Sequence, residues 1–449
     1  MTAVQKPLFS NQYLRRLIAP LVLEQTLAIT VGLADTMMIS AVGEAAVSGV
    51  SLVDMINNLL ISVLAALATG GAVVCSQLLG ARRRQDACRA ANQLCYTAVL
   101  GGVIVMVLVG ALCRPLLRLL FGSIAPDVME NAVTYMLISA LAFPFLALYN
   151  ACAALFRSMG NSRVTLRVSI LMNIINVAGN ALCVMVLKMG VAGVAIPSLV
   201  SRATAALILW VLLRRGNGDI QLIREKLRLD KAMISRILYI GIPSGIENGI
   251  FQLGRVLVVS VISTFGTVQI AANGVANGLD GVSVIMGQAM GLAMITVIGQ
   301  CVGAGDEAQV RYYTKKLMKI TYIGQSCVVA VLMILLQPIL SLYGLSEETR
   351  QLTATLVRIH GLVGMVLWPM AFVLPNMLRA CNDVRFTMVV SIGSMFVFRI
   401  MFSWILGRHL GWGVVGVWVA MVIDWVCRVC FFVGRYLRGD WRKAMEHKI

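Results

Sequence analysis

The stretch 17–42, LIAPLVLEQTLAITVGLADTMMISAV, is predominantly apolar yet carries two carboxylates, Glu24 and Asp35. It is long enough to cross a bilayer, because a helix rises about 1.5 Å per residue and the hydrocarbon core is about 30 Å thick. Eleven residues separate the two acids, which is about three helical turns, so they lie on one helix face. Carboxylates inside a membrane usually mark ion or substrate sites, and the alternative for each is a hydrogen-bonded structural role.

The whole chain is too apolar for a soluble protein. Its 449 residues are 59% hydrophobic and 13% charged, with a mean hydropathy of +0.86. Soluble domains are about 45–50% apolar and about 25% charged. The composition therefore predicts an all-α polytopic membrane protein embedded in the lipid bilayer. In such a protein, the basic residues behind the net charge of +18 indicate how the chain is oriented in the membrane, and they do not indicate a nucleic-acid partner.

The Lys and Arg residues cluster at alternate loops of the chain. Basic runs occur before the first predicted membrane helix and after every second one, for example at 82–89, 214–236 and 435–448. Cytoplasmic loops carry an excess of Lys and Arg. We therefore expect an even number of crossings in the inner (plasma) membrane, with both termini in the cytoplasm.

The sequence contains no metal-binding or catalytic motif that we recognise. The eleven cysteines have no regular spacing, and the histidines His360, His409 and His447 are far apart. Cys427 and Cys430 lie in an apolar helix without the βαβ pattern of a redox motif. No nucleophile with a base partner and no Walker loop is present. We expect no structural metal, no disulfide, no cofactor and no enzymatic activity.

Polar clusters divide the sequence into twelve helices of membrane-spanning length. The predicted spans are 14–42, 50–80, 91–121, 131–158, 164–187, 191–214, 233–265, 272–303, 312–342, 352–380, 386–408 and 414–438.

The two halves of the chain repeat one another. Pro20 and Glu24 recur as Pro243 and Glu247, and the motif QLLGA recurs as QCVGA, all with the same shift in numbering (243 − 20 = 223). Six crossings per half is an even number, so the halves share one orientation. This pattern predicts two parallel-repeat six-helix lobes related by an axis along the membrane normal, as in transporters that alternate access.

The repeat predicts an N-terminal lobe at 1–214, a cytoplasmic linker at 215–232 and a C-terminal lobe at 233–449. The linker alternates apolar and basic residues, which favours a short amphipathic helix on the membrane surface. A plain charged linker is the alternative. The apolar positions are Ile220, Ile223 and Leu227.

Several motifs in this order resemble one family of transporters. They are GLADTMMIS, TGGAVVCSQLLGARR and LFRSMGNSR in the first half, and GIPSGIEN, VIGQCVGAGD and LRACNDVRFT in the second. Together they resemble the multidrug and toxic compound extrusion (MATE) family. The resemblance implies a V-shaped pair of lobes that works by alternating access. It also implies antiport that exports small cationic amphipathic compounds in exchange for Na⁺ or H⁺.

The resemblance also implies a binding site in the first lobe. In the family, the aspartate that corresponds to Asp35 works with polar residues of the fifth and sixth helices. Here those residues are Asn173, Asn176, Asn180 and Ser198. Oxygens of Asp35, Asn176 and Asn180 would suit Na⁺, and burial of the same aspartate would suit H⁺. Simple interhelical hydrogen bonding is the alternative.

The second lobe departs from the first and from the family pattern. Val258 is the repeat partner of Asp35, and Phe251 stands where some relatives carry an ion-binding carboxylate. Glu247, one turn after Pro243, remains a candidate ion or substrate ligand. Pro20 and Pro243 each remove a helix hydrogen bond, so they are predicted kink sites near Glu24 and Glu247.

Arg399 and Asp424 lie near the middle of two predicted spans of the second lobe. We expect a buried structural ion pair between them, because breaking such a pair is costly. Arg428, one turn from Asp424, is the rival partner.

A flippase for lipid-linked oligosaccharides or peptidoglycan precursors is the alternative function, since such proteins share the superfamily architecture. A flippase would need a cavity lined with Arg or Lys for pyrophosphate, whereas this chain has carboxylates in its first lobe. We expect the protein to act as a monomer.

Overall fold

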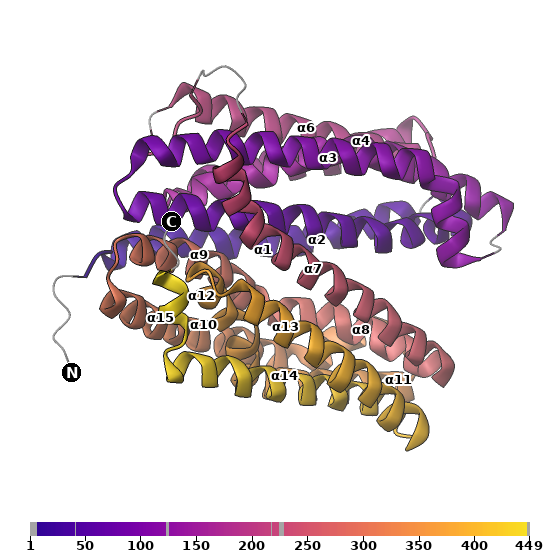
Figure 1. Ribbon diagram of the computed structural model, residues 1–449. Helices are drawn as coiled ribbons and strands as arrows, with labels where there is room; N and C mark the ends of the chain where they lie inside the picture. Colours follow the sequence, from indigo (N-terminus) through magenta and orange to yellow (C-terminus); the bar gives the residue numbers. More distant parts are fainter. Residues whose placement is uncertain (1–6, 41, 123–124, 217, 224–228, 447–449) are drawn as a thin grey trace. The chain divides into compact units, whose positions relative to one another are not determined.

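The computed structural model describes residues 7–40, 42–122, 125–216, 218–223 and 229–446, and all regular elements in these ranges are helices (Figure 1). Eleven of the described helices are long and apolar enough to cross a membrane. Helix α1 (Asn11–Ser40), with 30 residues, is the remaining span of the first lobe. The predicted all-α fold with twelve spans in two six-helix lobes is confirmed.

The first six spans are formed by seven elements. They are α1, α2 (Glu44–Gly80), α3 (Arg84–Phe121), α4 (Pro126–Ser158), α5 (Ser162–Asn180), its π-helical continuation η1 (Ala181–Val186) and α6 (Ala192–Arg215).

The last six spans contain more interruptions. The elements are α7 (Lys231–Ile262) with η2 (Ser263–Phe265), α8 (Thr267–Ser283), α9 (Ile285–Gly303), α10 (Glu307–Ser341), α11 (Glu347–Trp368) with η3 (Pro369–Val373) and α12 (Leu374–Ala380), α13 (Val384–Ser394) with η4 (Met395–Met401) and η5 (Ser403–His409), and α14 (Gly413–Arg438). A short helix, α15 (Trp441–Glu446), follows them.

Most helices begin earlier than predicted. Helix α3 begins at Arg84 and not at 91, and α10 begins at Glu307 and not at 312. The side chain of Asp306 accepts a hydrogen bond from the backbone N–H of Gln309 (3.0 Å), which caps α10. Because caps of this kind satisfy the first free N–H groups, helices extend beyond the apolar segment into polar sequence.

The eighth span, predicted as one helix over 272–303, is broken in the structure. Helix α8 ends at Ser283, and Val284 separates it from α9. The segment before the break contains glycines 274, 278 and 281, which weaken a helix because glycine loses more backbone entropy than other residues. The corresponding span of the first lobe, α2, continues for 37 residues without a break.

The structure forms two compact units, which are described separately. One comprises Gln12–Gly249, and the other comprises Ile250–Ile449 with the segment up to Asn11. The N-terminal segment joins the second unit through Phe9, whose backbone N–H donates to the hydroxyl of Tyr313 (2.7 Å). The division falls within α7, and the predicted lobe boundaries 1–214 and 233–449 stay a prediction.

The described part of the linker is not helical. The guanidinium of Arg84 donates to the carbonyl oxygens of Gly218 (2.7 Å) and Asp219 (3.0 Å), and Ile220 is buried. These contacts hold residues 218–223 against α3 in an irregular conformation, because they use backbone carbonyls that a helix would need. The predicted amphipathic helix is therefore wrong over Ile220 and Ile223, and Leu227 lies outside the described residues.

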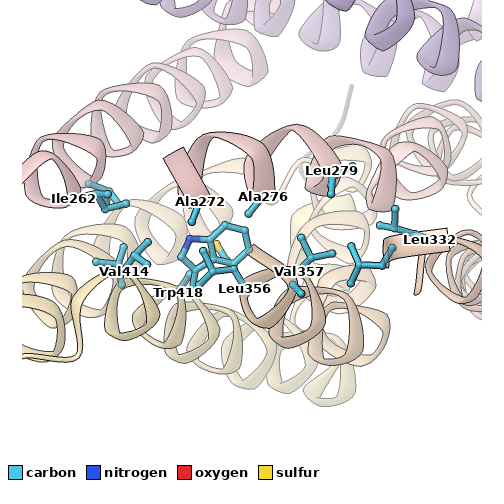
Figure 2. Packing of buried hydrophobic residues seen from close by; sticks show 14 of the residues in the cluster. Ile262, Ala272, Ala276, Leu279, Leu332, Leu356, Val357, Val414 and Trp418 are labelled. Carbon is cyan, nitrogen blue, oxygen red and sulfur yellow. The ribbon is translucent and has the colours of Figure 1, made fainter. Parts of the chain in front are cut away.

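Small side chains allow α8 to pack closely in the second unit. Figure 2 shows Ala272 and Ala276 of α8 next to Trp418 and Leu356, with Leu279 further along the same helix. All five side chains are buried. This packing places α8 directly against α11 and α14.

Close contact between α3 and α4 generates a prediction about stability. A methyl group at Gly102 would lie 2.6 Å from the Cα of Pro144, whereas one at the neighbouring Gly101 would meet nothing closer than 3.8 Å. Gly102→Ala should lower the free energy of unfolding by about 1 to 3 kcal/mol, because the backbone of α4 must move. Gly101→Ala should be neutral or slightly stabilising. Thermal unfolding in detergent tests the pair, and equal melting temperatures would contradict this packing argument.

Candidate functional site

Hydrogen bonds connect Asp35 on α1 to helices α5 and α6. Asn180, which is fully buried, donates from Nδ2 to Oδ1 of Asp35 (2.8 Å) and lies 3.3 Å from Oδ1 of Asn176. Asn176 in turn donates to the hydroxyl oxygen of Ser198 (2.8 Å). Four of the predicted site residues therefore form one connected polar chain inside the first unit.

The buried carbonyl oxygen of Asn180 has an acceptor position to spare. Its Oδ1 atom has no hydrogen-bond partner among the described residues, and the side chain is 0% exposed. An unsatisfied buried acceptor costs about 1–3 kcal/mol, so it favours a bound cation or donor. With the half-buried carboxylate of Asp35 beside it, this oxygen suits Na⁺ or a protonated group.

Asn173 lies outside this chain of hydrogen bonds. It precedes Asn176 by three residues on α5 and is half-buried, and no described hydrogen bond joins it to Asp35, Asn180 or Ser198. The sequence predicted Asn173 as a site residue because it shares a helix face with Asn176 and Asn180.

Three further residues of the first unit belong to the same region. The hydroxyl of Tyr135 on α4 donates to Oδ1 of Asp54 on α2 (3.2 Å). Asp54 and Arg202 both lie close enough to Asp35 to act on its charge. The formal charges of Asp54, Arg202 and ionised Asp35 add up to −1.

Sequence reasoning missed Asp54, Tyr135 and Arg202. Asp54 and Arg202 are charged residues in apolar spans, which is the same signal that singled out Asp35. Arg202 also follows Ser198 by four residues, on the same face of α6. Tyr135 has no such signal, because an aromatic residue is ordinary in an apolar helix.

Glu24 has different partners from Asp35, although both acids are on α1. Its Oε1 atom lies 2.5 Å from the guanidinium of Arg157, and its Oε2 atom accepts a hydrogen bond from Thr165 (3.2 Å). Glu24 is buried, and the side chain of Arg157 is 16% exposed. Glu24 is thus held by a countercharge from α4, whereas Asp35 is held mainly by amide groups.

In the second unit, Asp424 on α14 contacts two arginines. Nε of Arg428 donates to its Oδ1 atom (3.0 Å), and Nη1 of Arg399 lies 4.0 Å from its Oδ2 atom. Asp424 is 0% exposed. The rival partner Arg428 is therefore the nearer one, and the structural role of the Arg399–Asp424 pair stays a prediction.

The repeat places unlike residues at equivalent positions of the two units. Arg399 and Met421 occupy the positions of Asn176 and Ser198, with the same shift in numbering that relates the two prolines. The contact is retained but its chemistry differs: Nη2 of Arg399 lies 3.3 Å from Sδ of Met421. A guanidinium and a thioether replace an amide and a hydroxyl, so the second unit does not repeat the oxygen-rich shell.

The remaining predicted residues lie on α1 and α7. Glu247 is buried on α7, one turn after Pro243. Pro20 and Pro243 lie inside α1 and α7, which continue through them. The ligand role of Glu247 and the kink roles of both prolines stay predictions. Among the described residues, no three His, Cys, Asp or Glu side chains converge on a metal position.

Comparison with known proteins decides the family. A family model described as MatE matches residues 20–182 and 243–405, two segments that begin at the repeated prolines. The chain belongs to the MatE family. The match confirms the resemblance to MATE transporters drawn from the motifs.

Relatives resemble this MATE protein over nearly its full length. It is 27% identical over 443 residues to the Uncharacterized transporter YisQ of Bacillus subtilis (strain 168), covering 95% of this chain and 94% of the relative. It is 22% identical over 442 residues to the Probable multidrug resistance protein NorM of Thermotoga maritima, covering 95% and 92%.

Solved structures show the same fold. An outward-facing multidrug resistance MATE family transporter of the MOP superfamily matches with a TM-score of 0.89 at 20% identity, covering 98% of this chain and 100% of the other. A MOP superfamily transporter from Pyrococcus furiosus, described as having a binding pocket of reverse polarity, matches with a TM-score of 0.89 at 20% identity, covering 99% and 100%. This likeness shows the fold. Membership of the MatE family makes the protein a multi-pass membrane transporter and not an enzyme, and the flippase alternative is not favoured.

The ion pair of Glu24 generates a prediction about stability. In this MATE transporter, Arg157→Met should lower the free energy of unfolding by about 3 to 5 kcal/mol, because Glu24 would stay buried without its countercharge. The control is Asp86→Asn, which removes the exposed Arg83–Asp86 pair (2.8 Å) and should cost less than about 1 kcal/mol. Denaturant or thermal unfolding in detergent compares the two. Similar losses would show that Glu24 does not depend on Arg157.

Proposed function

We propose that this MATE transporter exports small cationic amphipathic compounds by antiport with Na⁺ or H⁺, through alternating access of its lobes. The observation that carries the proposal is the buried, unsatisfied Oδ1 atom of Asn180 beside the carboxylate of Asp35. Relatives named as multidrug resistance proteins support the substrate class. An exchange mechanism needs a group that holds either the coupling ion or the charge of the substrate, and Asp35 has that chemistry.

The surroundings of Asp35 favour exchange of one positive charge at a time. Arg202 supplies a tethered positive charge that offsets one of the two carboxylates, Asp35 and Asp54. The remaining charge of −1 is neutralised by one proton, one Na⁺ or one monovalent organic cation. Binding of one excludes the others because they share the same carboxylate.

Ion binding at Asp35 is coupled to helix shape through α1. Pro20 on the same helix lacks a backbone N–H and so leaves one carbonyl of the preceding turn without its helical partner. Neutralising Asp35 changes its bond with Asn180, which links α1 to α5. In this proposal the bend of α1 and the hydrogen bonds of Asp35 change together, which reshapes the surroundings of Asp35 in the first lobe.

The charge distribution supports an orientation in the plasma membrane. Basic residues follow every second span, which favours cytoplasmic termini by the positive-inside rule. Asp35 then lies in the outer half of α1, on the side to which substrate is released. A monomer suffices for this arrangement, since all residues of the first-lobe site come from one chain.

Replacing the carboxylate tests the exchange role directly. Asp35→Asn should abolish ion-coupled efflux while leaving folding intact, because the amide keeps the shape but cannot gain or lose charge. The measurement is efflux of a cationic dye from proteoliposomes under separately imposed Na⁺ and pH gradients. Glu44→Gln, at an exposed acid in the first turn of α2, is the control and should transport normally. Coupled efflux by Asp35→Asn would refute the assignment.

Separate replacement of Asn180 and Asn173 on α5 tests the series of hydrogen bonds that begins at Asp35. Asn180→Ala removes a hydrogen bond to a charged group, which is worth about 1.5 to 3 kcal/mol. Coupled efflux should therefore fall about tenfold or more. Asn173→Ala removes an amide outside the chain and should change the rate less than about twofold, since it costs no such bond. Initial rates in the same liposome assay decide, and equal losses would contradict the special place of Asn180.

A further inference from the structure

The second unit contains a titratable pair that the first-lobe site does not use, a buried histidine and a partly exposed aspartate. His360 on α11 is 3% exposed, and its Nδ1 atom is in ion-pair contact with Oδ1 of Asp280 on α8. A histidine is the side chain whose ordinary titration falls between about pH 5 and pH 8. The carboxylate of Asp280 is in contact with the imidazole, so the two groups together can gain and lose one proton.

Two tryptophans hold the imidazole ring in position. The ring centroid of His360 lies 4.5 Å from that of Trp425 and 5.6 Å from that of Trp418, with both pairs edge to face. Trp418 is itself fixed, because its Nε1–H donates to Oδ1 of Asn273 on α8 (3.0 Å). Trp418 lies directly against α8 in Figure 2. His360 therefore cannot swing away from Asp280 without disturbing α8 and α14.

Among the described residues, the charged group in contact with His360 is Asp280. On α14, Asp424 is committed to Arg428. Between Ile320 and Ser341, α10 carries no charged residue, and its Tyr322 donates to the carbonyl oxygen of Val366.

Other charges lie around this pair without contacting His360. On α11 itself, Arg358 is exposed. From η4, Arg399 is within electrostatic reach of both Asp280 and Arg255 on α7. Arg399 is therefore the nearby cation that acts on Asp280, while Asp280 is the described charge in contact with His360.

The pair lies beside the break in the eighth span. Asp280 is four residues before Val284, which separates α8 from α9. The first lobe has no counterpart, because the repeat positions of Asp280 and His360 are Asn57 and Leu137. Helix α8 is thus a separate segment, and one titratable contact joins its end to α11.

We propose that Asp280 and His360 form a proton-binding site of the second lobe that fastens α8 to α11 when it is protonated. The nitrogen lone pair of the imidazole forms the new N–H bond, and the pair changes from a charge of −1 to neutral. Loss of the proton leaves a neutral imidazole beside the carboxylate of Asp280, so the ion pair between α8 and α11 is lost and α8 loosens. The site rests on the proposed function only in that it would add a proton to the transport cycle of the second lobe.

The test is an NMR pH titration of the full-length protein with isotope-labelled histidine, in detergent or nanodiscs. The chain has three histidines, so the spectrum is simple, and His360→Gln identifies the signal. That signal should move between about pH 5 and pH 9. Asp280→Asn should displace its midpoint by about one pH unit or more, because the charged partner is lost. His409→Gln is the matched control, since His409 is exposed and stacks on Trp404.

A His360 signal that stays fixed over this range would overturn the proposal, as would a midpoint unchanged in Asp280→Asn. The wild-type titration needs no variant, so it remains decisive if Asp280→Asn does not fold. Hydrogen exchange of the α8 amides, corrected for intrinsic pH dependence, should be slower below the midpoint than above it. Equal exchange would overturn the fastening of α8.

The titration is independent of transport, so the two proposals fail separately. Protein that exports no dye but shows the His360 titration refutes the exporter and supports the proton site. Protein that exports dye with a fixed His360 signal does the reverse.

Discussion

The cost of placing charge in an apolar interior governs this transporter. A carboxylate removed from water loses several kcal/mol of solvation, which a partner must restore. Glu24 has Arg157 at 2.5 Å, and Asp424 has Arg428 at 3.0 Å. Asp35 differs, because its nearest described partner is the neutral amide of Asn180. A carboxylate without a contacting countercharge is the kind of group that our proposal needs, because it leaves room for an external cation.

Duplication followed by divergence explains why the two lobes are not equivalent. The family model matches each half once, and one pair of positions that meets across helices recurs in the second half. At one such pair, Asn176 and Ser198 of the first lobe correspond to Arg399 and Met421 of the second, so acceptor oxygens stand opposite a fixed cation. The break between α8 and α9 has no equivalent in α2. The lobes therefore share a scaffold, but their polar interiors carry different chemistry.

Much of the fold was predictable because hydropathy and charge act locally. Twelve apolar segments require twelve helices, since unpaired backbone groups cannot face lipid. Helix starts were less accurate, as for α3 and α10, because capping by Asp306 occurs in polar sequence. The break at Val284 was missed because scattered glycines weaken a helix without specifying where it ends. The linker beside α3 was mispredicted because contacts with Arg84, and not periodicity, determine its conformation.

The sequence by itself determined the membrane class, the internal repeat and the family, and it singled out Asp35 as a candidate. Each of these depends on residue type and spacing along the chain. Only the tertiary structure decided which partner each buried charge has. It paired Glu24 with Arg157 and placed Asp54, Tyr135 and Arg202 around Asp35. It also joined Asp280 to His360, which lies three helices further along the chain. Pairing between distant helices depends on how their faces pack, and no local pattern encodes that choice.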